Sequence, residues 1–212
     1  MAAAALLVSG ISLISLYRVA IDQHSLRLVE TVKSQARLIE AIAQFESLED
    51  VDRSPESVLQ ATLEKVKAAY EEFEGFGVSG EFVLARRQGN HINFVLSHRH
   101  GQSQPPDPIP IEGLWAEPMQ RALQGRSGIM TGLDYRGTEV LAAYEPVSIL
   151  ELGLIAKLDT REIRRPFINA ALLALAVTIL VIFIASRLFF RVSRPIEHVI
   201  DQQSETFRTL AE

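Results

Sequence analysis

The sequence predicts an α+β domain, with a long N-terminal helix and a five-stranded antiparallel sheet, flanked by two transmembrane helices. Three observations lead to this prediction. Long apolar stretches lie near the N-terminus and at 167–186. Apolar residues between 22 and 73 recur at helical spacing, and five short runs after residue 80 have an extended pattern. Helices that come first and strands that follow are typical of the α+β class.

Composition limits the functions that this chain can have. Its 212 residues suffice for one domain of ordinary size and a few further helices. The net charge is −5 and no basic tract is present, which argues against a nucleic-acid-binding protein. The absence of cysteine excludes a disulfide scaffold, a cysteine-ligated zinc site and a thiol nucleophile.

The stretch 167–186 predicts a transmembrane helix within 166–190. Its 20 residues are uncharged, and at about 1.5 Å per residue they span roughly 30 Å, the thickness of a hydrocarbon core. The N-terminal stretch is shorter and predicts a second transmembrane helix at 1–21, provided that Arg18 reaches the interface with its long side chain. A cleaved signal peptide is the alternative, although a basic segment and a clear cleavage site are missing.

The orientation of these spans does not follow from the flanking charges, because three arginines precede the second span and three follow it: Arg161, Arg164, Arg165, Arg187, Arg191 and Arg194. Residues 22–165 carry more acidic than basic side chains, which is compatible with an extracytoplasmic domain.

Residues 22–50 predict one long helix with two neighbouring apolar stripes. The first consists of Val29, Val32, Ala36, Ile39 and Ala43, and the second of Leu38, Ile42 and Phe45. If one stripe packs on the domain and the other on a second copy of the chain, a parallel homodimer results. A single wide stripe that faces the core is the alternative.

A second helix is predicted to begin at "SPES", with Ser54 as N-cap and Pro55 at the first helical position, and to end before Gly75. Beyond Gly80 the period becomes extended, and the first two strands, 81–87 and 91–98, flank the turn "QGN".

The proline-rich stretch 103–113 is predicted to be loop, and 117–125 a short helix with Pro118 in its first turn. Three further strands are predicted at 128–133, 138–147 and 152–159, the first two joined by "DYRG", in which Asp and Gly favour a turn.

Three blocks, "PMQRALQGRSG", "DYRGTEVLAAYEPV" and "GLIAKLD", together with the order of elements, resemble the single Cache sensor domains of bacterial transmembrane receptors such as sensor histidine kinases and diguanylate cyclases. The resemblance implies a PAS-like sheet outside the inner membrane. It further implies a small-molecule ligand on one face of that sheet, under the loop between strands two and three, and a membrane-anchored dimer with a cytoplasmic output module.

Residues 191–212 are expected to form a cytoplasmic signalling helix. "RVSRPIEHVI" looks like the opening of a HAMP linker, whereas "ETFRTLAE" equally resembles the first helix of a PAS domain. The chain is therefore expected to be the non-enzymatic input half of a longer receptor, and the resemblance to sensor histidine kinases implies a two-component system. The flanks of His198 do not resemble a phosphoacceptor box. A membrane-anchored scaffold whose domain binds another protein is the alternative.

Eight residues are candidates for ligand binding: Arg86, His98, Trp115, Arg126, Tyr135, Arg136, Tyr144 and Lys157. Arginines clamp carboxylates with a bidentate fork, and the aromatic residues could form a cage, which favours a carboxylate or an amino acid as ligand. The alternatives are solvated arginines, a core role for Tyr144, and solvated turn histidines for "HRH". Glu145 and Lys157 are charged groups of neighbouring strands that could pair with each other or meet a ligand.

No cofactor and no metal are expected. A glycine-rich phosphate loop, a serine elbow and a zinc helix are all absent from the sequence. His91 and Asp107 near "HRH" do not complete a convincing ligand spacing.

Overall fold

The computed structural model of the chain describes residues 2–49, 54–71, 75–97 and 106–209. Contacts between Cα atoms divide the chain into two compact units. One unit is Tyr17–Arg165, and the other combines Met1–Leu16 with Pro166–Glu212. The mixed class of helices and antiparallel sheet is confirmed, and all strands lie in the first unit.

Two helices are long and apolar enough to cross a membrane, at Leu6–Leu48 and Thr160–Arg191. In neither helix is the apolar window buried within the protein, and large apolar side chains such as Leu173, Phe183 and Phe189 are exposed. Leaving such a surface in water costs roughly 25 cal/mol per Å². A hydrocarbon environment removes this cost.

The helix α1 is continuous from Ala2 to Glu49, so the predicted boundary near residue 21 is not a break in the helix. The next helix, α2, spans Pro55–Glu71. Its predicted N-cap is confirmed, because the Ser57 amide donates a hydrogen bond to Ser54 Oγ at 3.2 Å.

The two predicted stripes of α1 differ in burial. Val32, Ala36, Ile39 and Ala43 are buried in the core shared with α2 and the sheet, as is Leu28. In the second stripe, Leu38 and Phe45 are 53% and 57% exposed. Ile42, the third member of the second stripe, is partly buried and packs against the same core, so this stripe is directed away from the core only at Leu38 and Phe45.

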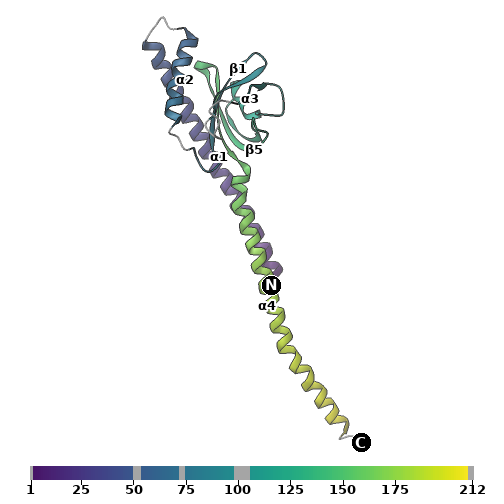
Figure 1. Cartoon of the computed structure of the whole chain (residues 1–212). Coiled ribbons are helices and arrows are strands. Elements are labelled where there is room, and N and C mark those ends of the chain that lie inside the picture. Colours follow the sequence, from purple (N-terminus) through teal and green to yellow (C-terminus); the bar gives the residue numbers. More distant parts are fainter. Residues whose placement is uncertain (1, 50–53, 72–74, 98–105, 210–212) are drawn as a thin grey trace. The chain divides into compact units, whose positions relative to one another are not determined.

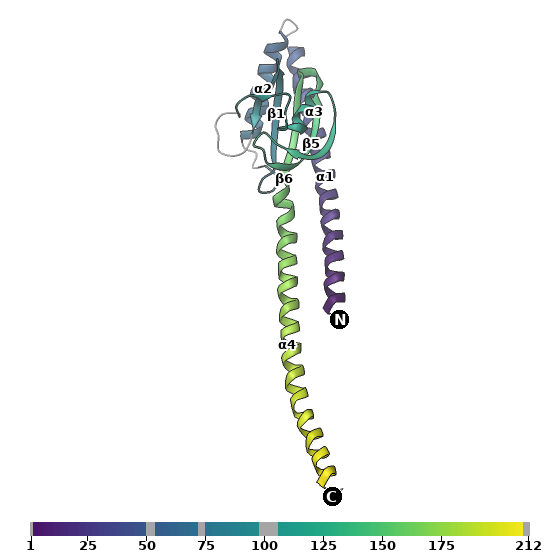
Figure 2. The same cartoon turned by 90° about the vertical axis from the view of Figure 1, so that its right-hand side faces the viewer.

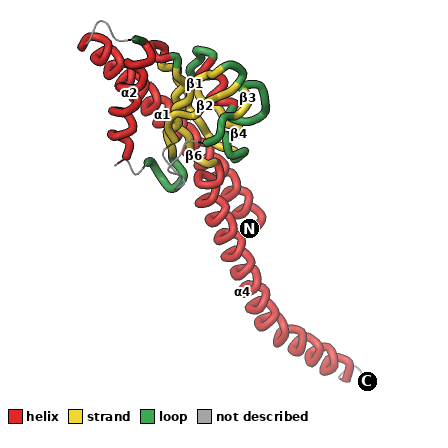
Figure 3. Tube along the Cα trace, turned by 45° about the horizontal axis from the view of Figure 1, so that its top comes forward, coloured by secondary structure: helices red, strands yellow, loops and turns green. Residues whose placement is uncertain are grey.

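Six strands form one antiparallel sheet in the order β3-β2-β1-β6-β5-β4 (Figure 3). Their bounds are Glu81–Gln88 for β1, His91–Ser97 for β2, Ile109–Pro110 for β3, Gly128–Leu133 for β4, Glu139–Val147 for β5 and Leu152–Asp159 for β6. The five predicted strands are present within one residue at each boundary. The prediction of five strands in total was wrong by one.

The additional strand, β3, lies in the proline-rich stretch that was predicted to be loop. Ile109 pairs with Ile92, and Pro110 pairs with His91. Proline lacks a backbone donor, but an edge strand leaves one row of backbone groups unpaired, so Pro110 is tolerated there. The sequence prediction treated the prolines as incompatible with a strand, and it did not consider that a strand at the edge of a sheet tolerates proline.

Helices cover both faces of the sheet. In Figures 1 and 2, α1 and α2 lie on one face, and α3, Glu117–Leu123, lies on the other. Alternation along β1 matches this arrangement: Phe82 and Leu84 belong to the core with α1 and α2, whereas Val83 and Ala85 belong to the core around Met119 of α3.

The central pair of strands joins distant parts of the sequence. β1 lies between β2 and β6, and its register with β6 places Glu81 opposite Lys157 and Leu84 opposite Leu154. β6 also pairs with β5, where Ala142 lies opposite Lys157. Lys157 therefore lies on one of the two central strands, near the end of β6, and on the α3 face that also carries Tyr144 and Ile155.

Candidate functional site

The candidate site is a cluster of buried charges around Lys157, on the face of the sheet that α3 covers. Lys157 Nζ lies 2.5 Å from Asp134 Oδ2 and 2.9 Å from Glu81 Oε2. The side chains of all three residues are fully inaccessible to solvent. Burying an unpaired charge costs several kcal/mol, so these three groups depend on one another.

Three separate elements position this triad. Lys157 is in β6 and Glu81 opens β1, its partner strand. Asp134 follows β4, in the turn to β5, where its Oδ1 accepts hydrogen bonds from the backbone amides of Arg136 and Thr138 at 2.8 and 3.0 Å. Asp134 therefore forms the turn that its position in "DYRG" predicts, and its second oxygen is left to bind Lys157.

Two side chains of the same turn extend the cluster. The Arg136 guanidinium bridges Asp134 Oδ2 at 2.7 Å and Asp159 Oδ1 at 2.8 Å. The Tyr135 hydroxyl donates a hydrogen bond to Glu81 at 3.1 Å, and its ring centroid lies 4.3 Å from Lys157 Nζ. The site thus combines the buried Lys157 ammonium and the partly buried Arg136 guanidinium with the ring of Tyr135 and with a network of ion pairs.

The charges of the cluster shift the pKa of its members. Burial alone would raise the pKa of Asp134, but the Lys157 ammonium and the hydrogen bonds that Asp134 accepts hold it below its ordinary value of 3.8. Burial would lower the pKa of Arg136, and the carboxylates of Asp134 and Asp159 reverse this effect and raise it. Both groups are therefore held in their charged forms.

The cluster lies next to the start of α4, Thr160–Thr209, which follows β6 without an intervening residue. The Asp159 amide donates to Ser79 Oγ at 3.0 Å. The Glu162 carboxylate accepts hydrogen bonds from the amides of Val78 and Ser79, each at 2.7 Å. The first turn of α4 is therefore tied to the segment that enters β1.

Gly77 shows how closely this segment approaches α4. Its φ is +71°, and a Cβ at this position would lie 2.6 Å from Glu162 Oε1. A larger residue would thus strain the backbone and displace the Glu162 carboxylate.

The other predicted ligand-binding residues have different environments. Trp115 is exposed before α3, and its ring lies 3.8 Å from where a Cβ at Gly137 would be, next to the turn that carries Tyr135 and Arg136. Tyr144 is buried in the core on the α3 face. Hydrogen bonding to Tyr144, and then to Glu117, raises the pKa of Arg121.

Two of the candidates, Arg126 and Arg86, lie apart from the cluster. Arg126 is exposed after α3. Arg86 is near the opposite end of β1 from Glu81, where it pairs with Glu56 of α2 at 3.1 Å. His98 lies outside the described residues.

The expected alternative pairing of Glu145 with Lys157 does not occur, because the two side chains lie on opposite faces of the sheet. Glu145 faces α1, where burial raises its pKa and the positive charges of Lys33 and Arg37 oppose that rise. A shift of one residue in the pairing of two strands moves a side chain to the opposite face of the sheet. The sequence does not specify how β5 and β6 pair, so it could not decide whether Glu145 and Lys157 share a face.

Sequence reasoning missed three carboxylates of the cluster: Glu81, Asp134 and Asp159. Asp134 was identified only as a turn former, although its position beside Tyr135 and Arg136 placed it near two candidates. Glu81 has the same parity as Val83 and Ala85 along β1, which put it on the face of α3. Within the described ranges, no group of three His, Asp or Glu side chains has the geometry to hold a metal ion.

Comparisons with protein-family models, with curated proteins and with solved structures return no match for this chain. The function therefore has to be argued from the site and from the chain's own organisation.

Replacing Lys157 by Met tests whether the triad stabilises the fold. We expect the free energy of unfolding to fall by about 3–5 kcal/mol, because Glu81 and Asp134 would remain buried without their cation. Urea denaturation of the full chain in detergent measures this change. The matched control is Arg164→Gln, which removes an exposed pair with Glu139 and should cost less than about 1 kcal/mol. Equal losses in both variants would contradict the central role of Lys157.

The stability of the wild type should also depend on Asp134 at acid pH. The folded-state pKa of Asp134 is below its ordinary 3.8, so the carboxylate contributes its full stabilisation above that value and loses it as the pH falls through the lower, folded pKa. We expect the stability difference between the wild type and Asp134→Asn to shrink below pH 3.8. Urea denaturation at several pH values measures it, and a constant difference across this window would refute the assignment.

Proposed function

We propose that this chain is the input half of a transmembrane signal-transduction receptor. Its α+β unit binds a small solute, such as a carboxylate or an amino acid, outside a bacterial inner membrane, and it relays a helix displacement to a cytoplasmic output module. The segment itself is not an enzyme in this proposal. The observation that carries it is the direct passage of β6 into α4, the helix that contains the second apolar stretch.

Several features support the proposal. In the sequence, the strands of the sheet follow one helix and precede another that are both apolar enough to cross a membrane. The sheet also has the intervening loop and the short helix that the Cache resemblance implies. The charge cluster, the anchored first turn of α4 and the strand β6 are contiguous. A change at the sheet therefore has a short, hydrogen-bonded route to α4.

Ligand binding can drive such a relay only if the ligand has unequal affinity for two arrangements of the protein. The α3 face offers charged groups that are already paired with one another. A solute with a carboxylate would compete for Arg136, and one with an amine would compete for Asp134 or Glu81. Either competition changes the partners of residues next to α4, which gives the two arrangements different energies.

We also propose that the receptor is a homodimer through the second stripe of α1. Leu38 and Phe45 are exposed large apolar side chains one helical face away from the buried stripe. A parallel contact between two copies of α1 would remove both from water. This arrangement would place two membrane anchors side by side.

A thermal-shift panel of carboxylates, amino acids and amines tests the solute-binding role on the full chain in detergent. A solute that binds only the folded state raises the melting temperature by mass action. We expect at least one member to raise it in the wild type and in Arg126→Gln, whose side chain is exposed, but not in Arg136→Gln. A panel without any effect would favour the alternative, a membrane-anchored scaffold that binds another protein.

Single cysteines test the homodimer, because the chain has none of its own. We expect Leu38→Cys and Phe45→Cys to form disulfide-linked dimers in membranes under mild oxidation, since a dimer seam would bring identical residues together. Lys33→Cys is the control, because Lys33 is exposed on the side of α1 that faces Glu145. Similar crosslinking at all three positions would indicate random collision and would contradict the proposed seam.

A further inference from the structure

A cleft of about 440 Å³ lies at the end of the sheet away from the β6–α4 junction. It is bounded by the start of α2, by the last residues of β1 and by the connection between β5 and β6. Its volume is within the usual range for small-molecule sites, roughly 300–1,000 Å³. The cleft is on the α1 and α2 side of β1, so it is distinct from the charge cluster under α3.

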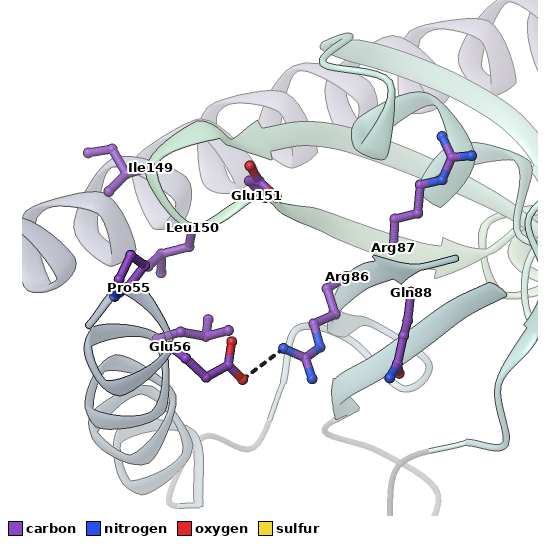
Figure 4. Close-up of a pocket in the computed structure, with 9 residues that line it drawn as sticks. Pro55, Glu56, Arg86, Arg87, Gln88, Ile149, Leu150 and Glu151 are labelled. Atoms are coloured by element: carbon purple, nitrogen blue, oxygen red, sulfur yellow. Dashed lines mark hydrogen bonds and ion pairs between the residues drawn. The ribbon is translucent and has the colours of Figure 1, made fainter. Parts of the chain in front are cut away.

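Two arginines line this cleft, Arg86 and Arg87, and they point in different directions. Figure 4 shows Arg86 and Gln88 directed to one side of β1, and Arg87 directed away from them. Arg87 is instead held by the carbonyl of Gly89, to which its Nε donates at 3.0 Å. Alternation along a strand explains the difference, because Arg86 and Gln88 are two residues apart.

The guanidinium of Arg86 is only partly used. Its Nη1 donates to Glu56 at 3.1 Å. Its Nε is buried and has no hydrogen-bond partner among the described residues. A buried donor without a partner costs about 1–3 kcal/mol, so the described residues leave part of the hydrogen-bonding capacity of Arg86 unused.

Gln88 supplies a second donor on the same side of the strand. Asn93 Nδ2 donates to Gln88 Oε1 at 3.1 Å, which fixes the oxygen of the Gln88 amide toward β2. The amide nitrogen is thereby left to donate elsewhere. Two donors therefore converge on one side of the cleft.

Glu56 is a replaceable partner for Arg86. Its side chain is 64% exposed, so water screens its attraction to the guanidinium. The rest of the lining is mixed: an apolar wall is formed by Pro55, Leu59, Ile149 and Leu150, and two further charged residues, Arg87 and Glu151, lie at the edge. A ligand with a carboxylate at one end and a short aliphatic tail at the other would match both parts.

From these observations we propose that the Arg86 cleft is a binding site for a small aliphatic carboxylate. The carboxylate takes the place of Glu56 on the Arg86 guanidinium and accepts a hydrogen bond from Gln88, and the tail lies against Leu59 and Leu150. The site goes beyond the proposed receptor function, since it is on the other face of the sheet and its occupancy does not require any signal to pass to α4.

Butyrate tests this site by saturation-transfer difference NMR on the full chain in micelles of deuterated detergent. We expect wild-type protein to bind butyrate and Arg86→Gln to bind it at least about tenfold more weakly, because a charge-assisted pair is lost. Glu56→Gln should bind it about threefold more tightly, since the competing carboxylate is removed. Arg126→Gln is the control and should bind as the wild type does, because Arg126 is exposed after α3 and does not line the cleft.

The opposite signs of the Arg86 and Glu56 effects keep the test decisive even if Arg86→Gln fails to fold. Absence of butyrate binding to the wild type, or unchanged affinity in Glu56→Gln, would overturn the proposal. Inorganic phosphate and n-butylamine are the comparison probes, and stronger binding of either one would overturn the assignment to a carboxylate. Repeating the solute panel with Arg86→Gln separates this site from the α3 face, because effects at that face persist in the variant.

Discussion

The fold depends on one constraint, the burial of the Lys157 ammonium on a central strand of the sheet. Without Lys157, the buried carboxylates of Glu81 and Asp134 would lose the cation that both of them contact, and without these two the buried Lys157 ammonium would lose both of its ion pairs. Each of the three comes from a different segment of the chain. The β1–β6 pairing and the β4–β5 turn must therefore both form in their native arrangement. An error in either one would leave a buried charge without its partner.

The same constraint reaches the start of α4. Asp159 and Arg136 extend the cluster to the last residue of β6, and the segment before β1 holds Glu162 and the Asp159 amide. Helix α4 is thus joined to the sheet through polar contacts with defined partners, in addition to apolar packing by Ile163. Polar contacts have fewer alternative arrangements than apolar ones, so the first turn of α4 has a defined position on the sheet.

Most of the elements could be predicted because their signals are local. The N-cap at Ser54, the turn at Asp134 and the buried stripe of α1 each follow from residues within a few positions of one another. The charge cluster could be predicted only in part. Tyr135, Arg136 and Lys157 were candidates by residue type, whereas Glu81 was missed because its pairing with Lys157 spans 76 positions of sequence and depends on the strand register. No local signal encodes that register.

The two-residue strand β3 has a consequence for the association of copies of this chain. It covers the end of β2 beside the hairpin, and Pro110 within it has no N–H group to offer to another strand. An extended segment of another chain therefore has only a short strand to pair with at this edge of the sheet, and one of the two residues of that strand lacks a backbone donor. Copies of the chain therefore have little opportunity to polymerise through this edge, and association is left to surfaces of side chains.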